Sequence, residues 1–419
     1  MEKITIAIAG LGARGYDTYG KFLLEMKDIA QVVAVAEPRP LRREMAAAAF
    51  CLGQEACYET AEEMLTKERL ADVMFICTLD DMHEHQAVAA LERGYHLLLE
   101  KPVAPTAEGC RRIAEAARKY QRHVAVCHVL RYTPFYQKIK QIIDGGTIGD
   151  IVNIQAMEHV GYWHQAHSFV RGNWRNESET SPMILQKCCH DMDILLWLTG
   201  RHCKSVTSFG SLKLFKEAMA PEGSTTRCTD DCQVKDTCPF NAVTYYEDQL
   251  KKGNTDWPVN VVCTDPTPEK VYEALEHGPY GRCVYRCDND VVDHQVVNLL
   301  LEDDITVNFT MCAFTEKCYR TLEISGTEGE ITGNMGENWI KVCRFGQEPE
   351  LIDVNALARD FSGHGGGDVR MVRDFLTYIQ TDPQHKEMLT SVERSVESHY
   401  VALAAEESRK QGGEVVRLD

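Results

Sequence analysis

The first 128 residues alternate between short apolar runs rich in β-branched side chains and amphipathic stretches with helical spacing, and this alternation constrains the fold most strongly. Strands are predicted over residues 4–9, 30–38, 71–78, 95–102 and 123–129. Helices are predicted over residues 19–26, 83–94 and 106–121. This β–α order predicts a doubly wound parallel sheet, which binds its ligands at the carboxyl ends of the strands.

The turn after the first strand has the sequence Gly10-x-Gly12-x-Arg14-Gly15. Gly10 permits a tight turn, Gly12 lets the backbone approach a pyrophosphate, and Gly15 allows the next helix to pack closely. The amino end of that helix then offers its amide groups to the phosphates. Glu37 ends the second strand 22 residues after Gly15, where a carboxylate binds ribose hydroxyls and repels a 2′-phosphate. The turn therefore predicts a dinucleotide-binding domain that prefers NAD.

Arg39 is the signal for the opposite choice, because an arginine beside the ribose can hold the 2′-phosphate of NADP. We expect NAD as the cofactor and keep NADP as the weaker alternative. Polar residues at the other strand ends complete the expected site. The predicted cofactor contacts are Gly10, Leu11, Gly12, Arg14, Gly15, Glu37, Arg39, Thr78, Asp80, His83, Glu100, Lys101 and His128.

The formal charge of −18 over 419 residues argues against nucleic-acid binding, because no basic run offsets the repulsion of phosphates. This length exceeds what one hydrophobic core usually supports, so two domains are expected. The sequence contains no apolar run of membrane-spanning length and enters a strand at once, without the features of a signal peptide. We therefore expect a cytoplasmic protein without a membrane partner, whose 17 cysteines are mostly reduced.

Beside the glycine turn, the chain contains the segments TLDDMHEHQAVAAL and LLLEKPVAPT, and later GTIGDIVNIQA, ISGTEGEI and GHGGGD. Together they resemble the Gfo/Idh/MocA family of NAD(P)-dependent oxidoreductases, named after glucose–fructose oxidoreductase and inositol dehydrogenase. The resemblance implies an α/β fold with a Rossmann domain over residues 1–128. It also implies an α/β domain over residues 129–419, built on a large open, mostly antiparallel sheet. In the family the lysine of Glu-Lys-Pro, here Lys101, lies beside the nicotinamide and the substrate hydroxyl.

Hydrophobic periodicity divides the second half into further elements. Strands are predicted over residues 150–163, 296–314 and 317–334, the second of them a pair around an Asp-Asp turn. Helices are predicted over residues 181–200 and 394–413. Residues 216–290 are polar, contain Pro and Gly, and have weak periodicity, so they are expected to form a cysteine-containing insertion.

The predicted helix over residues 181–200 carries the segment MILQKCCHDMD. Members of the family usually have an aspartate here and, four residues later, a histidine that acts as general base towards the alcohol. His190 matches the histidine, but Gln186 replaces the aspartate and Lys187 lies beside it. Glutamine can orient a hydroxyl but cannot take its proton, whereas Lys187 adds a second titratable amine. The predicted catalytic residues are Lys101, Gln186, Lys187 and His190.

Metal binding, thiol catalysis and a purely structural role for His190 are the alternatives for this segment. Cys188 and Cys189 are adjacent, so on a helix they diverge by about 100° and cannot both bind one ion with His190. Cys188 instead follows the spacing of the apolar residues, and apart from Lys187 nothing favours a thiolate. We therefore expect His190 to transfer a proton and the cysteines to pack as apolar side chains.

The segment YWHQAHSFVRGNWRN gathers aromatic rings with His and Arg donors. Aromatic faces stack on sugar rings, and the donors suit several hydroxyls or an anionic substituent. A solvated loop is the alternative for each residue taken singly. The predicted substrate contacts are Arg131, Tyr132, His164, His167, Arg171, Trp174 and Arg175.

Cysteines cluster in the expected insertion as Cys228-x3-Cys232-x5-Cys238, followed by Cys283 and Cys287. Thiolates on a segment without its own core are plausible ligands of a structural zinc. The fourth ligand would be Cys283, with Cys287 as the alternative. Because the spacing is not the usual C-x2-C, reduced surface thiols and an adventitious disulfide remain open.

The sequence therefore predicts an NAD-dependent enzyme that takes hydride from a secondary hydroxyl of a sugar, glycoside or cyclitol. The first alternative is an NAD-dependent glycosidase, in which transient oxidation at C3 leads to elimination of the aglycone without net redox change. In that reaction Lys187 could be the added base. The second alternative is a non-catalytic NAD or sugar sensor. A small carbohydrate is the expected partner, and the chain is expected to form a homodimer or tetramer, as family members often do.

Overall fold

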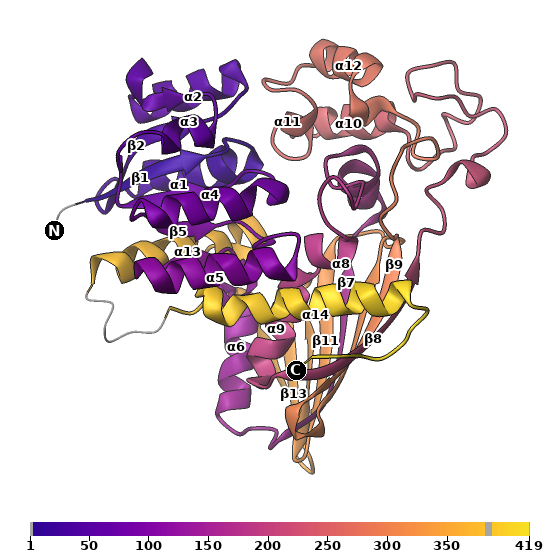
Figure 1. Cartoon of the computed structure of the whole chain (residues 1–419). Helices are drawn as coiled ribbons and strands as arrows, with labels where there is room; N and C mark the ends of the chain where they lie inside the picture. The colour runs from indigo at the N-terminus through magenta and orange to yellow at the C-terminus, as the bar shows by residue number, and fades with distance from the viewer. Residues whose placement is uncertain (1–2, 382–387, 419) are drawn as a thin grey trace.

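The structure is a computed structural model that describes residues 3–381 and 388–418. Six parallel strands form the first sheet in the order β3-β2-β1-β4-β5-β6 (Figure 1). The strands are β1 (Ile4–Ala9), β2 (Ala30–Ala36), β3 (Cys57–Tyr58), β4 (Val73–Ile76), β5 (His96–Leu99) and β6 (Val124–Val126). The predicted doubly wound parallel sheet is confirmed, and β3 is an edge strand that the sequence pattern did not indicate.

Helices connect these strands on both faces of the sheet. They are η1 (Ala13–Gly20), α1 (Lys21–Glu25), α2 (Pro40–Phe50), α3 (Ala61–Leu65), α4 (Asp80–Glu92) and α5 (Ala107–Tyr120). Local sequence sets their ends: the Thr106 hydroxyl accepts a hydrogen bond from the Gly109 amide at the start of α5, and Gln121 ends it in the left-handed conformation.

The second sheet has nine strands in the order β14-β13-β12-β11-β7-β10-β9-β8-β15. Its strands are β7 (Ile151–His159), β8 (Cys203–Ser211), β9 (His294–Leu301), β10 (Thr306–Cys312), β11 (Tyr319–Gly326), β12 (Gly329–Asn334), β13 (Trp339–Arg344), β14 (Glu350–Asp353) and β15 (Val416–Arg417). Only the β7–β10 pair is parallel among the pairings of the described strands in this sheet. The mostly antiparallel second sheet is therefore confirmed, as is the predicted turn at Asp303 and Asp304, both with positive φ.

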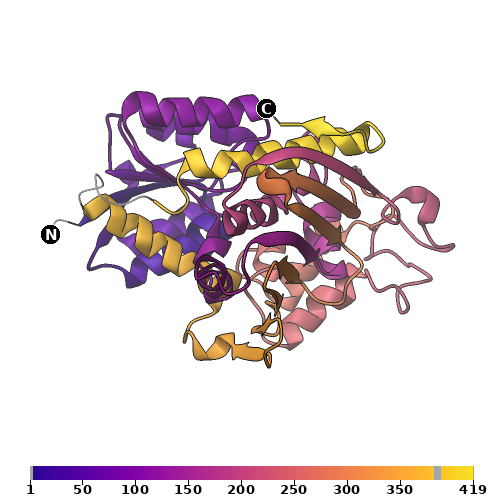
Figure 2. The ribbon, with the colours of Figure 1, turned by 90° about the horizontal axis from the view of Figure 1, so that it is seen from below.

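One face of this sheet is buried under helices, and the other is open. The covering elements are η3 (Val129–Tyr132), α6 (Pro134–Asp144), α8 (Met183–Gln186), α9 (Cys189–Thr199) and α14 (Val392–Lys410), whereas α13 (Ser362–Gln380) packs on the core of the first sheet. Inward-facing Ile154, Phe309 and Ile331 are fully buried, whereas Asn298 and Asn308 hydrogen-bond to each other on the exposed face. Helix α14 packs on β8 and α9 and also reaches α5, so the C-terminal region joins both halves (Figures 1 and 2). None of the helices in the described residues is long and apolar enough to cross a membrane.

The long connection from β8 to β9 spans the residues for which the sequence predicts an insertion, and that name is kept for it below. It contains α10 (Ala242–Lys251), α11 (Val259–Val262) and α12 (Pro268–His277), with two short segments of 3-10 helix, η5 (Glu217–Met219) and η6 (Pro279–Gly281). These helices lie beyond the end of the second sheet, next to the first domain (Figure 1). A small apolar cluster of their own, which includes Tyr246, Val259 and Leu275, holds them together.

A buried ion-pair network ties the two halves together at the glycine turn. Arg14 on η1 contacts Glu100 after β5 at 2.6 Å and Asp368 on α13 at 2.6 Å. The Tyr19 hydroxyl donates to the same Glu100 carboxylate at 2.6 Å. Burial alone would raise the pKa of Asp368, but the charge of Arg14 outweighs it and lowers that pKa. The glycine turn, the end of β5 and the start of α13 are thus fixed relative to one another.

We expect Gly15→Ala to destabilise the protein, because a Cβ at this position would lie 1.9 Å from the Gly10 carbonyl oxygen. The free energy of unfolding in urea should fall by about 1–3 kcal/mol, the usual cost of forced overpacking. Gly12→Ala is the matched control, since its Cβ would meet only Arg39, at 3.7 Å. Equal stabilities of the two variants would contradict this packing.

We also expect stability to fall on acidification between pH 6.5 and 5. Burial lowers the pKa of His167 and of His399 to about 3. Below pH 6.5 these two histidines become protonated in the unfolded chain but stay neutral in the folded protein. Each histidine should therefore lower the free energy of unfolding by about 2 kcal/mol at pH 5. His399→Gln should give a shallower slope of urea-unfolding free energy against pH. A slope unchanged by this variant would show that His399 does not carry the effect.

Candidate active site

Lys101 reaches from the end of the first sheet into the second domain. It follows β5 directly, and its ammonium donates a 2.7 Å hydrogen bond to the backbone carbonyl of Gln186. Such a charge-assisted bond is stronger than a neutral one. The lysine of the Glu-Lys-Pro motif is thereby fixed beside the segment that carries His190.

The single helix predicted over residues 181–200 is wrong, because the chain breaks at Lys187 and Cys188. Helix α8 ends at Gln186 and α9 begins at Cys189, and Cys188 has φ −100° and ψ 7°. The Gln186 carbonyl takes its hydrogen bond from Lys101 instead of from a fourth residue further along the helix. Gln186 and His190 therefore do not share one regular helical face, although both are buried in the same region.

His190 is a buried, uncharged imidazole in this structure. Burial, together with the neighbouring positive charge of Lys101, lowers the pKa of His190 well below its ordinary value. Its ring lies 5.6 Å from that of His364 and 6.0 Å from that of His128. The Nδ1 atom of His190 is buried without a hydrogen-bond partner among the described residues. An imidazole in this state can accept a proton from a bound molecule.

His364 belongs to the site and was missed from the sequence. It lies in the segment GHGGGD, where Gly363, His364, Gly365 and Gly366 all have positive φ. Its Nδ1 contacts Asp368 at 3.0 Å, and Asp368 is the partner of Arg14. The glycine-rich segment was a visible signal, since consecutive left-handed residues bring the backbone into an unusual course.

A buried charge network lies on the other side of Lys187. Its ammonium contacts Glu158 at 3.0 Å, and Arg320 contacts both Glu158 at 3.0 Å and Asp191 at 2.7 Å. Burial would lower the pKa of Lys187, but the charge of Glu158, its hydrogen bond and the nearby Cys318 together outweigh burial and raise that pKa. Lys187 is therefore a positively charged donor, and this setting argues against its role as a base. Glu158 and Arg320 were missed, because a charged residue inside an alternating strand gives no local sign of its partner.

Gln186 is held by its side chain as well as by its backbone. Its Nε2 donates to Asp80 at 2.6 Å, and the Ser181 hydroxyl donates to the same carboxylate at 2.9 Å. Asp80, predicted as a cofactor contact, thus braces the residue whose carbonyl holds Lys101. The structure brings together Lys101, Gln186, Lys187, His190 and Asp80, which the sequence placed in separate segments.

Among the predicted substrate residues, His164 faces this group. Burial and the charge of Lys187 lower the pKa of His164 well below its ordinary value, so its ring is neutral. Its ring lies 5.5 Å from Trp163 and 5.1 Å from Trp257 of the insertion. These aromatic rings form a wall beside Lys187. Trp257 was missed, because only the tertiary fold brings the insertion to this position.

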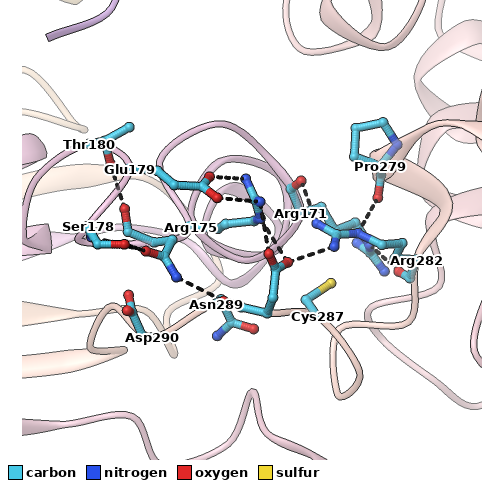
Figure 3. A network of polar contacts seen from close by, with 12 residues as sticks. Arg171, Arg175, Ser178, Glu179, Thr180, Pro279, Arg282, Cys287, Asn289 and Asp290 are labelled. Carbon is cyan, nitrogen blue, oxygen red and sulfur yellow. Dashed lines mark hydrogen bonds and ion pairs between the residues drawn. The ribbon is translucent and has the colours of Figure 1, made fainter. Parts of the chain in front are cut away.

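Three other predicted substrate residues contact the insertion or its neighbouring segments. His167 hydrogen-bonds the Tyr246 hydroxyl at 2.6 Å. Arg171 donates to the carbonyls of Phe240 at 2.6 Å and Arg282 at 2.7 Å. Figure 3 shows Arg171 and Arg175 pointing to opposite ends of one polar network.

Arg175 pairs with Asp288 at 2.8 Å and with Glu179 at 3.0 Å.

The remaining three predicted substrate residues point to the interior of the protein. Arg131 binds Asp193 through both arms, at 2.6 and 2.8 Å, Tyr132 contacts Asp374, and Trp174 packs partly buried on the core. In this structure these residues, which were predicted to contact the substrate, make contacts within the protein.

Glu37 holds the turn at which a dinucleotide ribose is expected. Its carboxylate accepts from the Leu11 amide at 2.8 Å and pairs with Arg39 at 2.6 Å. Burial would raise the pKa of Glu37, but the hydrogen bonds from Arg39 and Leu11 outweigh it and lower that pKa. Glu37 is therefore an anion, and Arg39 is neutralised by it.

The remaining predicted cofactor contacts form supports around the strand ends. The Thr78 hydroxyl donates to Gln86 at 2.7 Å. His83 contacts the Pro102 carbonyl through Nδ1 at 2.8 Å, which braces the segment after Lys101. His128 pairs with Asp193 at 2.5 Å and is fully buried.

The cysteines of MILQKCCHDMD are packed in the core. Both Cys188 and Cys189 are fully buried, and burial raises the pKa of Cys189 to about 12. Cys189 lies with His128 and His399 in a group whose ligand atoms are within 4.8 Å of one another. The Nε2 of His399 accepts from the Val103 amide at 2.8 Å, so this nitrogen is already engaged within the protein. Neither thiol is suited to nucleophilic attack.

The insertion also contacts the first domain directly. Asn260 donates to Asp17 on η1 at 3.0 Å, and Arg42 on α2 pairs with Asp17 at 2.8 Å. Lys21 contacts Asp256 at 3.2 Å. Residues 256–260 therefore connect the aromatic wall on one side with the glycine-turn helix on the other.

Comparison with known proteins agrees with this architecture. Residues 4–128 match the model of an oxidoreductase family with an NAD-binding Rossmann fold, Gfo/Idh/MocA, and residues 140–418 match that family's C-terminal α/β domain. The putative oxidoreductase YteT of Bacillus subtilis is 22% identical over 405 residues, which cover 90% of this chain and 89% of YteT. Inositol 2-dehydrogenase of Corynebacterium glutamicum (strain ATCC 13032) is 27% identical over 207 residues, 49% of this chain and 57% of that enzyme.

Solved structures share the fold over the whole chain. The WlbA dehydrogenase from Bordetella pertussis, in complex with NADH and UDP-GlcNAcA, has a TM-score of 0.69 and 16% identity, with 100% of this chain and 98% of that chain covered. Aldose-aldose oxidoreductase from Caulobacter crescentus, complexed with glycerol, has a TM-score of 0.66 and 14% identity, with both chains fully covered. Since the two family models together match most of its residues, the chain belongs to the Gfo/Idh/MocA oxidoreductase family, with an NAD-binding Rossmann domain followed by the family's α/β domain.

Proposed function

We propose that the protein is an NAD-dependent oxidoreductase that acts on a secondary hydroxyl of a sugar, glycoside or cyclitol. The observation that supports this most is the pairing of a fixed ammonium, Lys101, with a buried neutral imidazole, His190, whose Nδ1 lacks a partner among the described residues. Together they offer a donor and a proton acceptor to one hydroxyl group. The sugar-related substrate class is supported by two proteins that share this fold, the WlbA dehydrogenase in complex with UDP-GlcNAcA and aldose-aldose oxidoreductase.

The residues present fit a dinucleotide. The Gly10 turn leaves no room for a side chain, Gly12 has open space on the ligand side, and the Glu37 carboxylate lies at the end of β2. NAD, when bound, would supply the hydride acceptor. Lys101 would hold the substrate hydroxyl oxygen, and His190 would accept its proton as the C–H bond gives up hydride. Lys187 and His164 would donate to neighbouring substrate oxygens, and Gln186 would act mainly by holding Lys101.

A redox-neutral glycosidase is the second candidate, and one observation favours it. The contacts of Asn260 and Asp17 close the insertion over the helix that follows the glycine turn. Such a closure would keep a bound cofactor in place, which suits a reaction that returns its hydride in each cycle. The raised pKa of Lys187 argues against the base role that this reaction could give it, so the net dehydrogenase is the first choice.

One assay separates these functions. The protein would be incubated with a panel of sugars, cyclitols and chromogenic glycosides, and both the absorbance of reduced nicotinamide and the release of aglycone would be followed. Net reduced cofactor supports the dehydrogenase, and aglycone without net reduction supports the glycosidase. If neither reduced cofactor nor aglycone is formed, the result favours a non-catalytic NAD or sugar sensor. A cytoplasmic location and a homodimer or tetramer remain our predictions for the assembled protein.

His190→Ala should lower kcat by about a hundredfold or more, because a positioned general base contributes on this scale. Lys101→Ala should be comparably damaging, whereas Cys188→Ser and Cys189→Ser should affect stability more than rate. Steady-state turnover of the four variants on one substrate measures this. Near-normal turnover of His190→Ala, or a folded but inactive cysteine variant, would indicate that a thiol rather than His190 is the catalytic group.

The acid limb of the kcat/KM profile should lie below pH 6.5. His190 must be neutral to accept a proton, and its lowered pKa keeps it neutral at pH values where an exposed histidine is already charged. The rate should therefore stay constant as the pH falls through 6.5 and decline only in more acidic solution. A decline centred at or above pH 6.5 would be inconsistent with the buried environment of this base.

NAD should bind more tightly than NADP, because the Glu37 carboxylate repels a 2′-phosphate while Arg39 is already neutralised by it. Glu37→Gln should narrow the difference between the two dissociation constants. Gly12→Ala should weaken both cofactors equally, since its Cβ would stand between the backbone and the pyrophosphate. Fluorescence titration measures these affinities. Tighter binding of NADP by the unmodified protein would mean that Arg39 binds the 2′-phosphate and determines the cofactor preference.

A further inference from the structure

We propose that Cys228, Cys232, Cys238 and Cys283 bind one zinc ion that holds the two ends of the insertion together. This inference is independent of the substrate and of the redox chemistry. It rests on the convergence of the four thiols around one small cavity, which segments 45 residues apart in the sequence enclose together. Such a site would be structural, because four protein ligands leave no position for substrate.

The backbone brings the two cysteine segments together. Arg227 and Arg282 form an isolated antiparallel bridge. The Cys228 amide donates to the Gly281 carbonyl at 2.8 Å, and the Cys283 amide donates to the Thr226 carbonyl at 2.9 Å. Cys228 and Cys283 are thus neighbours across two paired segments. The spacing of the cysteines in the sequence does not predict this pairing, which only the tertiary structure shows.

The turn after Cys228 supplies the other two thiols. The Lys235 amide donates to the Cys232 carbonyl at 3.3 Å, and the Cys238 amide donates to the Val234 carbonyl at 2.9 Å. All four sulfur-bearing residues line a cavity of about 20 Å³, a volume that suits a single small ion. The quartet is more open than the His128 cluster, whose ligand atoms lie within 4.8 Å, so ligation would draw the sulfurs inward by side-chain rotation.

The structure also distinguishes the two candidates for the fourth ligand. Cys283 lines the cavity with the other three cysteines. Cys287 is not among the residues that line it, and its sulfur instead contacts the Cys283 carbonyl at 3.3 Å. Cys283 is therefore the ligand, and Cys287 is a matched control within the same segment.

Arg171 supplies a counter-charge at the site. Its guanidinium lies 3.6 Å from the Cys228 sulfur and is buried. Zinc binding would convert four thiols to thiolates and release four protons, which leaves a site of net charge −2. A buried guanidinium stabilises such a charge. Arg171 also belongs to η4 (Gln165–Arg171), which directly follows His164, so the metal would stabilise the segment that carries His164.

The test is metal analysis of the full-length protein by inductively coupled plasma mass spectrometry. We expect about one zinc per chain in the unmodified protein and in Cys287→Ser. Cys238→Ser and Cys283→Ser should each lower the zinc content at least fivefold. Loss of zinc in Cys287→Ser with retention in Cys283→Ser would overturn this ligand set.

A second measurement needs no variant and so does not depend on whether the serine proteins fold. A mercurial reagent is titrated into the unmodified protein, and a chromogenic chelator records the zinc that is released as thiols react. Release of about one equivalent, with four thiols protected beforehand, supports the site. Stoichiometric iron instead of zinc, no bound metal with freely reactive thiols, or a mass about 2 Da lower from a disulfide would each overturn it.

Discussion

The buried ion pairs of Arg14 are the contact on which the arrangement of the site depends. One guanidinium holds Glu100, which precedes Lys101, and Asp368, which orients His364. Removing one partner from a buried pair typically costs about 3–5 kcal/mol, because a charge is left without compensation. The strand-end lysine, the glycine turn and the loop from α13 are therefore positioned as one unit, and the chemistry of Lys101 and His190 is built on it.

A positively charged lysine and a neutral histidine lie close together around the end of β5. Glu158 holds Lys187 as a cation, Arg320 lies between Glu158 and Asp191, and His190 stays neutral beside Lys101. Neighbouring titratable groups that differ in this way are typical of acid–base sites. The side chain of Gln186 donates to Asp80, and its backbone carbonyl accepts from the Lys101 ammonium, so this residue connects the two.

The insertion between β8 and β9 contacts both halves of the molecule. It brings Trp257 next to His164, and it contacts the first domain through Asn260. Arg171 and His167 join it to the segment after β7. Residues that resemble sugar-binding donors in the sequence thus hold the insertion in place, and the insertion in turn places Trp257 against His164.

Local periodicity and the glycine motif in the sequence determined the Rossmann sheet and its turn. The antiparallel second sheet and the candidate pair Lys101 and His190 followed from the resemblance of short motifs to the family. The sequence did not determine the break at Lys187 and Cys188, which follows from the hydrogen bond of Lys101 to Gln186. Nor did it indicate Glu158, Arg320, His364 or Trp257, whose partners lie far away along the chain. Only the tertiary structure decided these positions, since long-range ion pairs and the path of an insertion leave no periodic trace in the sequence.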